Sequence, residues 1–193
     1  MPRLSLLVLL VAGCATAQTP PAVEAGIPTT DPVRPSDVAP VVGPEAAERT
    51  ATETAVAETI AQEGVHVVRL WAPWCGNSRA ELEGGVWRDL VEAHPDVTFS
   101  FVTIWSDGRD GAEMLRRFGV SEGVAVYAQP DRGPSANRSL RRTTFLGLPL
   151  SWTPTTWIFN RGGKLAYAFN YGEVNAEQIA QAIDDANDPW AHD

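Results

Sequence analysis

Short apolar runs alternate along the chain with stretches whose apolar residues recur every three or four positions. Three runs rich in β-branched and aromatic residues predict strands, at 65–72, 97–105 and 124–127. Four stretches have the apolar spacing of amphipathic helices, at 45–63, 75–93, 111–118 and 173–188. Two further runs, 155–160 and 165–171, flank the turn Arg161-Gly162-Gly163 and predict a hairpin. This order predicts an α/β fold with a mixed central β-sheet flanked by helices.

One long connection, 129–152, interrupts this pattern. Its middle is basic and contains Arg132, Arg138, Arg141 and Arg142. Long loops are often functional, so this one is a candidate to receive an acidic partner. Because charged runs usually face water, we favour the simpler interpretation, a solvated excursion.

The first residues have the pattern of an export signal. A basic residue is followed by an apolar run over 4–12 that is too short to span a bilayer as a permanent helix. The sequence VAGC at 11–14 resembles the lipobox of bacterial lipoproteins, which implies removal of residues 1–13 and lipidation of Cys14. Several acyl chains would then anchor the protein to a membrane. The alternative is an ordinary secretory signal with an incidental cysteine.

The lipoprotein resemblance implies a place in the cell envelope, facing the periplasm. Ala15 follows the cysteine where an aspartate would signal retention, which favours the outer membrane in a Gram-negative cell. The proline-rich, polar stretch 14–44 cannot bury enough apolar surface to fold, so it is predicted to be a flexible tether. The folded domain is expected over 45–193.

The composition argues against binding sites for nucleic acid, metals and cofactors. With 44% hydrophobic and 20% charged residues and a net charge of -9, the chain can bury a core but offers no basic surface for nucleic acid. The three histidines are scattered without metal-ligand spacing, so we expect no metal, and no motif indicates a cofactor. Of the two cysteines, Cys14 belongs to the predicted anchor, which leaves Cys75 as the only thiol of the domain. Nothing in the sequence fixes the oligomeric state.

Cys75 has the strongest chemical context in the chain. It follows the predicted strand 65–72 and opens the next predicted helix. Unpaired backbone N–H groups and the positive end of the helix dipole stabilise a thiolate at such a position. Because the thiolate is the nucleophile in disulfide exchange, the sequence predicts thiol chemistry at this residue.

The segment WAPWCGNS at 71–78 resembles the active site of the thioredoxin family, and WTPTTWIF at 152–159 resembles the family's cis-proline segment. The resemblance covers residues 60–188 approximately and is strongest to the membrane-tethered TlpA-like branch, whose members act on thiols outside the cytoplasm. It implies a thioredoxin-like three-layer sandwich in which Pro154 lies opposite Cys75. It also implies that Thr153 presents its backbone to a bound polypeptide, with thiol-containing envelope proteins as partners.

Four tryptophans lie close to these two motifs in sequence. Trp71 and Trp157 are expected in the core. Trp74 and Trp152 flank the cysteine and the proline, where exposed rings would form a docking surface for substrate. Gly76 and Asn77, next to the cysteine, are included in this predicted substrate contact.

Two positions depart from the family's pattern. Ser78 stands where the resolving cysteine would be, and its hydroxyl cannot attack a mixed disulfide, although it could hydrogen-bond the Cys75 thiolate. Arg69 stands where many relatives have a buried acid, on an apolar strand face, so we expect it to pair with Glu81. This pair either tunes the thiolate or is a structural ion pair only.

Two functions remain open from the sequence. The preferred one is thiol–disulfide exchange by a single-cysteine lipoprotein acting on protein or small-molecule thiols in the envelope. The alternative is a redox-inactive binding or scaffolding domain that keeps the fold and the groove at the cis-proline. A thiol peroxidase is disfavoured, because no set of peroxide-orienting residues accompanies the cysteine.

Overall fold

A computed structural model of the protein describes residues 49–120, 122–133 and 141–188. Its helices and strands, in chain order, are α1 (Ala51–Ile60), β1 (His66–Trp71), α2 (Gly76–Glu83), α3 (Val86–Ala93), β2 (Thr98–Thr103), α4 (Ala112–Arg117), β3 (Val124–Ala128), β4 (Thr144–Phe145), β5 (Leu148–Pro149), β6 (Thr155–Phe159), β7 (Leu165–Asn170) and α5 (Ala176–Asn187). The predicted signal peptide, the lipidation site Cys14 and the tether 14–44 lie outside the described residues, so they stay predictions. No helix in the described ranges is long and apolar enough to cross a bilayer.

Five strands form one mixed sheet in the order β3-β2-β1-β6-β7. β1 pairs in parallel with β2, and β2 with β3, whereas β6 runs antiparallel to both β1 and β7. The connection from β1 to β2 passes through α2 and α3, as parallel neighbours require a crossover. The predicted hairpin is β6–β7, with its turn at Gly163, whose φ of 70° suits glycine.

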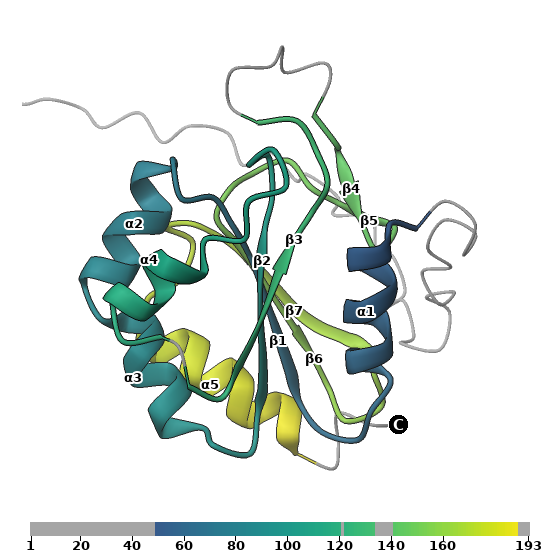
Figure 1. Ribbon diagram of the computed structural model, residues 1–193. Coiled ribbons are helices and arrows are strands. Elements are labelled where there is room, and N and C mark those ends of the chain that lie inside the picture. The colour runs from purple at the N-terminus through teal and green to yellow at the C-terminus, as the bar shows by residue number, and fades with distance from the viewer. Residues whose placement is uncertain (1–48, 121, 134–140, 189–193) are drawn as a thin grey trace, which may run out of the picture. The chain divides into compact units, whose positions relative to one another are not determined.

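The sheet is covered on both faces (Figure 1). The helices α2, α3, α4 and α5 pack on one face, against residues such as Val67, Trp71 and Phe101. α1 and the β4–β5 hairpin pack on the other, against residues such as Val68 and Leu70. Because successive side chains of a strand point to opposite faces, both sets of β1 side chains are buried. The predicted thioredoxin-like α/β sandwich, with a mixed sheet between helices, is confirmed.

The single helix predicted over 75–93 is wrong. It is divided into α2 and α3 by Gly84 and Gly85. Gly85 has a φ of 75°, a left-handed conformation that a β-carbon disfavours and that interrupts the helical hydrogen bonds. The break changes the direction of the chain and brings Trp87 into the core, where it is 1% exposed.

The solvated excursion favoured for 129–152 is also wrong for its second half. Phe145 in β4 is fully buried and packs against Trp157, and Leu150 is buried beside it in the same apolar cluster. The carboxylate of Glu53 in α1, also fully buried, accepts hydrogen bonds from the backbone N–H of Leu146 and from the guanidinium of Arg142, each at 2.9 Å. Apolar burial and the ion pair of Arg142 with the buried Glu53 carboxylate therefore fix residues 141–150 to the sheet and to α1. Residues 134–140 lie outside the described ranges.

Candidate active site around Cys75

Cys75 is the N-cap residue of α2. Its backbone is extended, with φ -77° and ψ 123°, and its carbonyl accepts the first helical hydrogen bond, from Arg79 N, at 3.1 Å. The side chain makes no capping hydrogen bond and is partly exposed. The sulfur therefore lies where the unpaired N–H groups of α2 are concentrated, as the sequence predicts.

The cis-proline segment lies directly opposite this cysteine. The Thr153–Pro154 peptide bond is cis, and the Cys75 thiol donates a hydrogen bond to the Thr153 carbonyl oxygen, with a Sγ–O distance of 3.3 Å. The predicted juxtaposition of the two motifs is therefore confirmed. Pro154 is buried and Thr153 partly buried, while its hydroxyl oxygen has no hydrogen-bond partner among the described residues.

A buried cation lies on β1, the central strand of the sheet, which leads into the loop before the cysteine. Arg69 in β1 is 3% exposed, and its guanidinium forms an ion pair with the Glu81 carboxylate of α2. Desolvation lowers the pKa of Arg69 to about 10, and the charges of Glu81 and Cys75 act in the opposite direction. Arg69 is therefore still a cation at neutral pH. The predicted Arg69–Glu81 pair is confirmed, while its role in thiol chemistry stays a prediction.

Two partners of this ion pair were not anticipated from the sequence. The Arg69 guanidinium donates to the hydroxyl of Thr156 in β6 at 2.6 Å, and it lies 4.6 Å from the ring centroid of Trp87. The Trp87 indole in turn donates to the Glu81 carboxylate at 3.0 Å. Arg69 thus ties α2, which carries the cysteine, to the strand that follows the cis-proline. The alternating pattern of the strand predicts which face of the sheet Arg69 occupies. Thr156 lies next to it only because β6 pairs with β1, which the sequence pattern does not show.

Ser78 occupies the position of the missing resolving cysteine and is 2% exposed. Its hydroxyl oxygen accepts a hydrogen bond from the Ala72 N–H at 3.3 Å. Among the described residues no hydrogen bond joins it to Cys75, so the hydrogen bond considered from the sequence is not formed here. Ser78 instead holds the loop that connects β1 to the cysteine.

The tryptophans divide as the sequence predicts. Trp71 and Trp157 are buried, whereas Trp74 is 38% and Trp152 65% exposed. Gly76 and Asn77 are exposed beside the cysteine. An exposed aromatic side chain therefore directly precedes the nucleophile, and another begins the cis-proline segment.

Trp74 is held by residues that the sequence does not single out. Its indole N–H donates to the carbonyl oxygen of Trp105 at 2.7 Å. The Arg141 guanidinium lies over both indole rings, 5.4 Å from the centroid of Trp74 and 5.5 Å from that of Trp105. Trp105 has a left-handed φ of 52° and donates its backbone N–H to the Asp131 carboxylate at 2.8 Å. Contacts from the 129–152 connection therefore help to set the position of Trp74.

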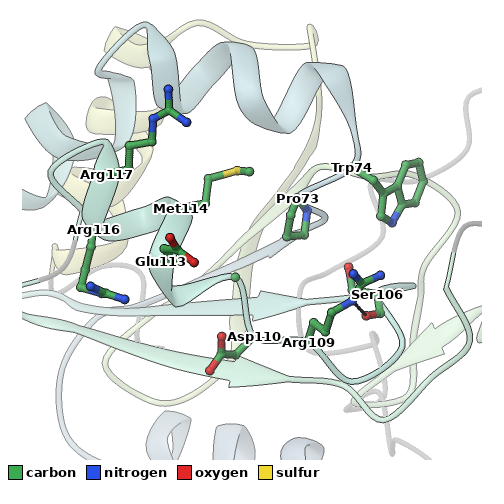
Figure 2. A pocket seen from close by; sticks show the side chains of 10 residues that line it. Pro73, Trp74, Ser106, Arg109, Asp110, Glu113, Met114, Arg116 and Arg117 are labelled. Atoms are coloured by element: carbon green, nitrogen blue, oxygen red, sulfur yellow. Dashed lines mark hydrogen bonds between the residues drawn. The ribbon is translucent and has the colours of Figure 1, made fainter.

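A depression of about 920 Å³ adjoins the site on the side of Trp74 (Figure 2). Its lining comes from the loop before the cysteine, from the connection between β2 and α4, and from α4 itself: Pro73, Trp74, Ser106, Arg109, Asp110, Gly111, Glu113, Met114, Arg116 and Arg117. None of these residues except Trp74 was predicted as a site residue. No group of three or more metal-ligating side chains occurs among the described residues.

Comparisons with known proteins give matches among solved structures. A DsbF homologue from Corynebacterium diphtheriae is 19% identical over 66% of this chain and 74% of its own, with a TM-score of 0.48. A thiol:disulfide interchange protein of the thioredoxin family from Chlorobium tepidum is 15% identical over 67% and 83%, with a TM-score of 0.46. A secreted thiol-disulfide isomerase from Corynebacterium glutamicum is 22% identical over 64% and 72%, with a TM-score of 0.43. No protein-family model matches this chain, and no curated protein matches it.

Proposed function

We propose that this protein carries out thiol–disulfide exchange with Cys75 as its single nucleophile. The observation that carries the proposal is the position of the sulfur. It is partly exposed at the N-terminus of α2 and lies 3.3 Å from the carbonyl of the residue before the cis-proline. The helix terminus favours the thiolate, and the partial exposure leaves the sulfur accessible to a substrate disulfide.

The reaction is a pair of substitutions at sulfur. The Cys75 thiolate attacks one sulfur of a substrate disulfide; a bond forms between Cys75 and that sulfur, and the other substrate sulfur leaves as a thiolate. A second thiolate, from a protein or small-molecule thiol of the envelope, then attacks the mixed disulfide and releases the Cys75 thiolate. No net oxidation or reduction occurs, since one disulfide and one thiolate enter and one of each leaves.

Ser78 determines that the second thiol must come from outside. A hydroxyl cannot displace the substrate from a mixed disulfide, whereas a cysteine at this position, one helical turn after Cys75, could do so. The proposal therefore includes a long-lived mixed disulfide. Such a species suits exchange and isomerisation, in which a substrate thiol itself completes the reaction.

The surrounding residues have distinct roles in this proposal. The Arg69 cation stabilises the Cys75 thiolate, and the Glu81 carboxylate moderates that effect by neutralising part of the positive charge. The exposed side chains of Trp74 and Trp152 contact the substrate, together with Gly76 and Asn77. The backbone of Thr153, held by Pro154, pairs with the substrate polypeptide, which displaces the hydrogen bond from the Cys75 thiol.

The proposed location is the cell envelope. Lipidation of Cys14 would attach the chain to a membrane, the outer membrane in a Gram-negative cell, and residues 14–44 would hold the domain away from the lipid surface. Partners would then be envelope proteins that contain thiols or disulfides. Labelling the protein with a radioactive fatty acid in a bacterial host, with Cys14→Ser as control, tests the anchor.

One observation favours a second candidate, a redox-inactive binding domain. The hydrogen bond from the Cys75 sulfur to the Thr153 carbonyl needs the protonated thiol, so it opposes formation of the thiolate. In this alternative the groove beside Pro154 binds a polypeptide without exchange.

A trapping experiment separates the two candidates. The full chain with Cys14→Ser, whose only thiol is Cys75, is mixed with a peptide disulfide, and the covalent complex is identified by mass. The exchange proposal expects a complex that persists until a small thiol is added and that is absent with Cys75→Ser. It also expects Ser78→Cys to shorten the lifetime of the complex. The binding alternative expects peptide affinity that Cys75→Ser leaves unchanged, with no covalent complex.

A further inference from the structure

The depression beside Trp74 extends the surface next to the nucleophile. Pro73 and Trp74, which directly precede Cys75 in the chain, line one part of it, and Met114 projects into it from α4 (Figure 2). Methionine adapts its shape to different partners, and it is frequent on surfaces that bind varied polypeptides. A polypeptide attached to Cys75 through a mixed disulfide would meet this surface with the residues on one side of its cysteine.

Glycine at position 111 keeps the floor of the depression close to the site. A β-carbon built there would lie 2.7 Å from an atom of the Trp71 ring and 3.1 Å from Pro73. Gly111 also has a left-handed φ of 68° and precedes α4 directly. The start of α4 is therefore packed against the loop that carries Cys75, and the depression has a defined wall.

The charges of the lining are unlike those of the whole chain. The chain has a net charge of -9 and only 15 lysine and arginine residues, yet three of these, Arg109, Arg116 and Arg117, line this one depression. Arg109 has a weak partner, Asp107, at 3.7 Å, with both side chains largely exposed. Arg116 and Arg117 form no ion pair with any described residue, although Arg117 lies over the Phe118 ring at 5.6 Å.

Two carboxylates also belong to the lining. One oxygen of Asp110 accepts the backbone N–H of Ala112 at 3.0 Å, so this carboxylate is used to begin α4. Glu113 is exposed on the same helix as the two unpaired arginines. The lining therefore carries three positive and two negative side chains, and one of the negative ones already has a backbone partner.

We propose that this depression binds an acidic polypeptide segment adjoining the reactive cysteine of the substrate. The three guanidinium groups are spread along the depression: Arg109 lies at the end near Trp74, and Arg116 and Arg117 point to different sides of α4 (Figure 2). This spacing suits an extended chain with several carboxylates better than one small anion. The inference rests on the proposed exchange at Cys75 and specifies its substrate class.

Three activated peptides test the proposal. Each carries one cysteine as a mixed disulfide with thionitrobenzoate, and four aspartates, four asparagines or four lysines beside it. Attack by Cys75 on the peptide sulfur forms the peptide–Cys75 disulfide and releases thionitrobenzoate, whose absorbance gives the rate. The protein is the full chain with Cys14→Ser. Because the chain is acidic overall, its net charge alone would make the lysine peptide the fastest.

The proposal expects the aspartate peptide to react at least about fivefold faster than the lysine peptide at low ionic strength, with the difference falling as salt is added. The pair Arg116→Glu and Arg117→Glu should abolish or reverse this order. The matched control, Arg161→Glu with Lys164→Glu, changes the same charge at the β6–β7 turn, at the opposite end of β6 from Pro154, and should preserve the order.

Three results would overturn the proposal. The first is an equal rate for the three peptides, and the second is an equal effect of the two charge reversals. The third is inhibition of the aspartate peptide by inorganic phosphate beyond that of chloride at the same ionic strength, which would indicate a site for any small anion. Failure of the asparagine peptide to react would instead refute exchange at Cys75 itself.

Discussion

Replacement of Arg69 by methionine tests the buried ion pair between Arg69 and Glu81. The substitution keeps an unbranched apolar stem in β1 but removes the cation, which is 3% exposed, and leaves Glu81, 17% exposed, without it. Breaking a buried pair in this way costs about 3 kcal/mol, at the lower end of the usual range because Glu81 retains some solvent and the Trp87 N–H. The lost hydrogen bond to Thr156 is part of that value.

The double variant Arg69→Met with Glu81→Gln separates charge from packing. Glutamine keeps an oxygen that accepts the Trp87 N–H, but it leaves no unpaired charge. The double variant should therefore lose about 2 kcal/mol less unfolding free energy than the sum of the losses in the two single variants. Denaturant unfolding followed by tryptophan fluorescence measures all four chains. A cost below about 1 kcal/mol for Arg69→Met, or simple additivity, would refute the energetic reasoning.

The same variants test the influence of the pair on the thiol. Arg69→Met should slow alkylation of Cys75 at pH 7, and Glu81→Gln should accelerate it, because one removes a nearby cation and the other removes the anion that neutralises it. Unfolding free energies control for loss of structure. If both variants are well folded and the rate of Cys75 alkylation is unchanged in each, the ion pair has a structural role only.

Three further predictions concern the scaffold. Phe145→Ala should lower the unfolding free energy by about 3 to 5 kcal/mol, since the ring is fully buried, and a value near zero would restore the solvated interpretation of 129–152. Gly111→Ala should lower the unfolding free energy by about 1 to 3 kcal/mol, because the added β-carbon would meet the Trp71 ring. Gly85→Ala should lower it by less, because there the β-carbon would meet only the flexible end of Arg88; equal effects would contradict this. Burial opposes ionisation of Glu53, but hydrogen bonds from Thr50 and Leu146 and the charge of Arg142 outweigh it and lower its pKa below the ordinary 4.5. The ionised carboxylate therefore stabilises the fold above that value, so the stability gap between the wild-type chain and Glu53→Gln should shrink as the pH falls from 7 to 3 in urea titrations; a constant gap would refute the assignment.

The parts of the site that could be predicted depend on short-range patterns. The run from a buried strand into Cys75 is contiguous, so its strand–turn–helix form follows from propensity and helix-terminus chemistry. The Arg69–Glu81 pair follows from two periodicities, since a charge on an apolar strand face needs a partner on the helix that packs over it. The break at Gly84-Gly85 was not predicted, because the apolar spacing continues across the two glycines, although glycine is a poor helix former.

The parts that were missed depend on contacts far apart in the chain. Glu53 lies in a helix whose local pattern is ordinary, and its partners Arg142 and Leu146 are 89 and 93 residues away. The contact of Thr156 with Arg69 exists only because β6 inserts beside β1. The spacing of residues along the chain does not reveal such long-range partners. For the same reason, the local sequence does not show whether a basic segment is held against the fold or faces solvent.

The central claim is that Cys75 acts as the nucleophile of the exchange, for which it must react as the thiolate. The measurement that tests it most directly is the ratio of the Cys75 alkylation rates at pH 7 and pH 9, in the full chain with Cys14→Ser, native and unfolded in urea. Taking a ratio removes the effect of partial burial on the absolute rate. An ordinary cysteine is only a few per cent thiolate at pH 7, so the unfolded chain should lose most of its rate. The account predicts that the native chain retains at least several times more of its pH 9 rate than the unfolded chain does. Equal ratios in the two states would contradict it and leave the binding domain as the better description.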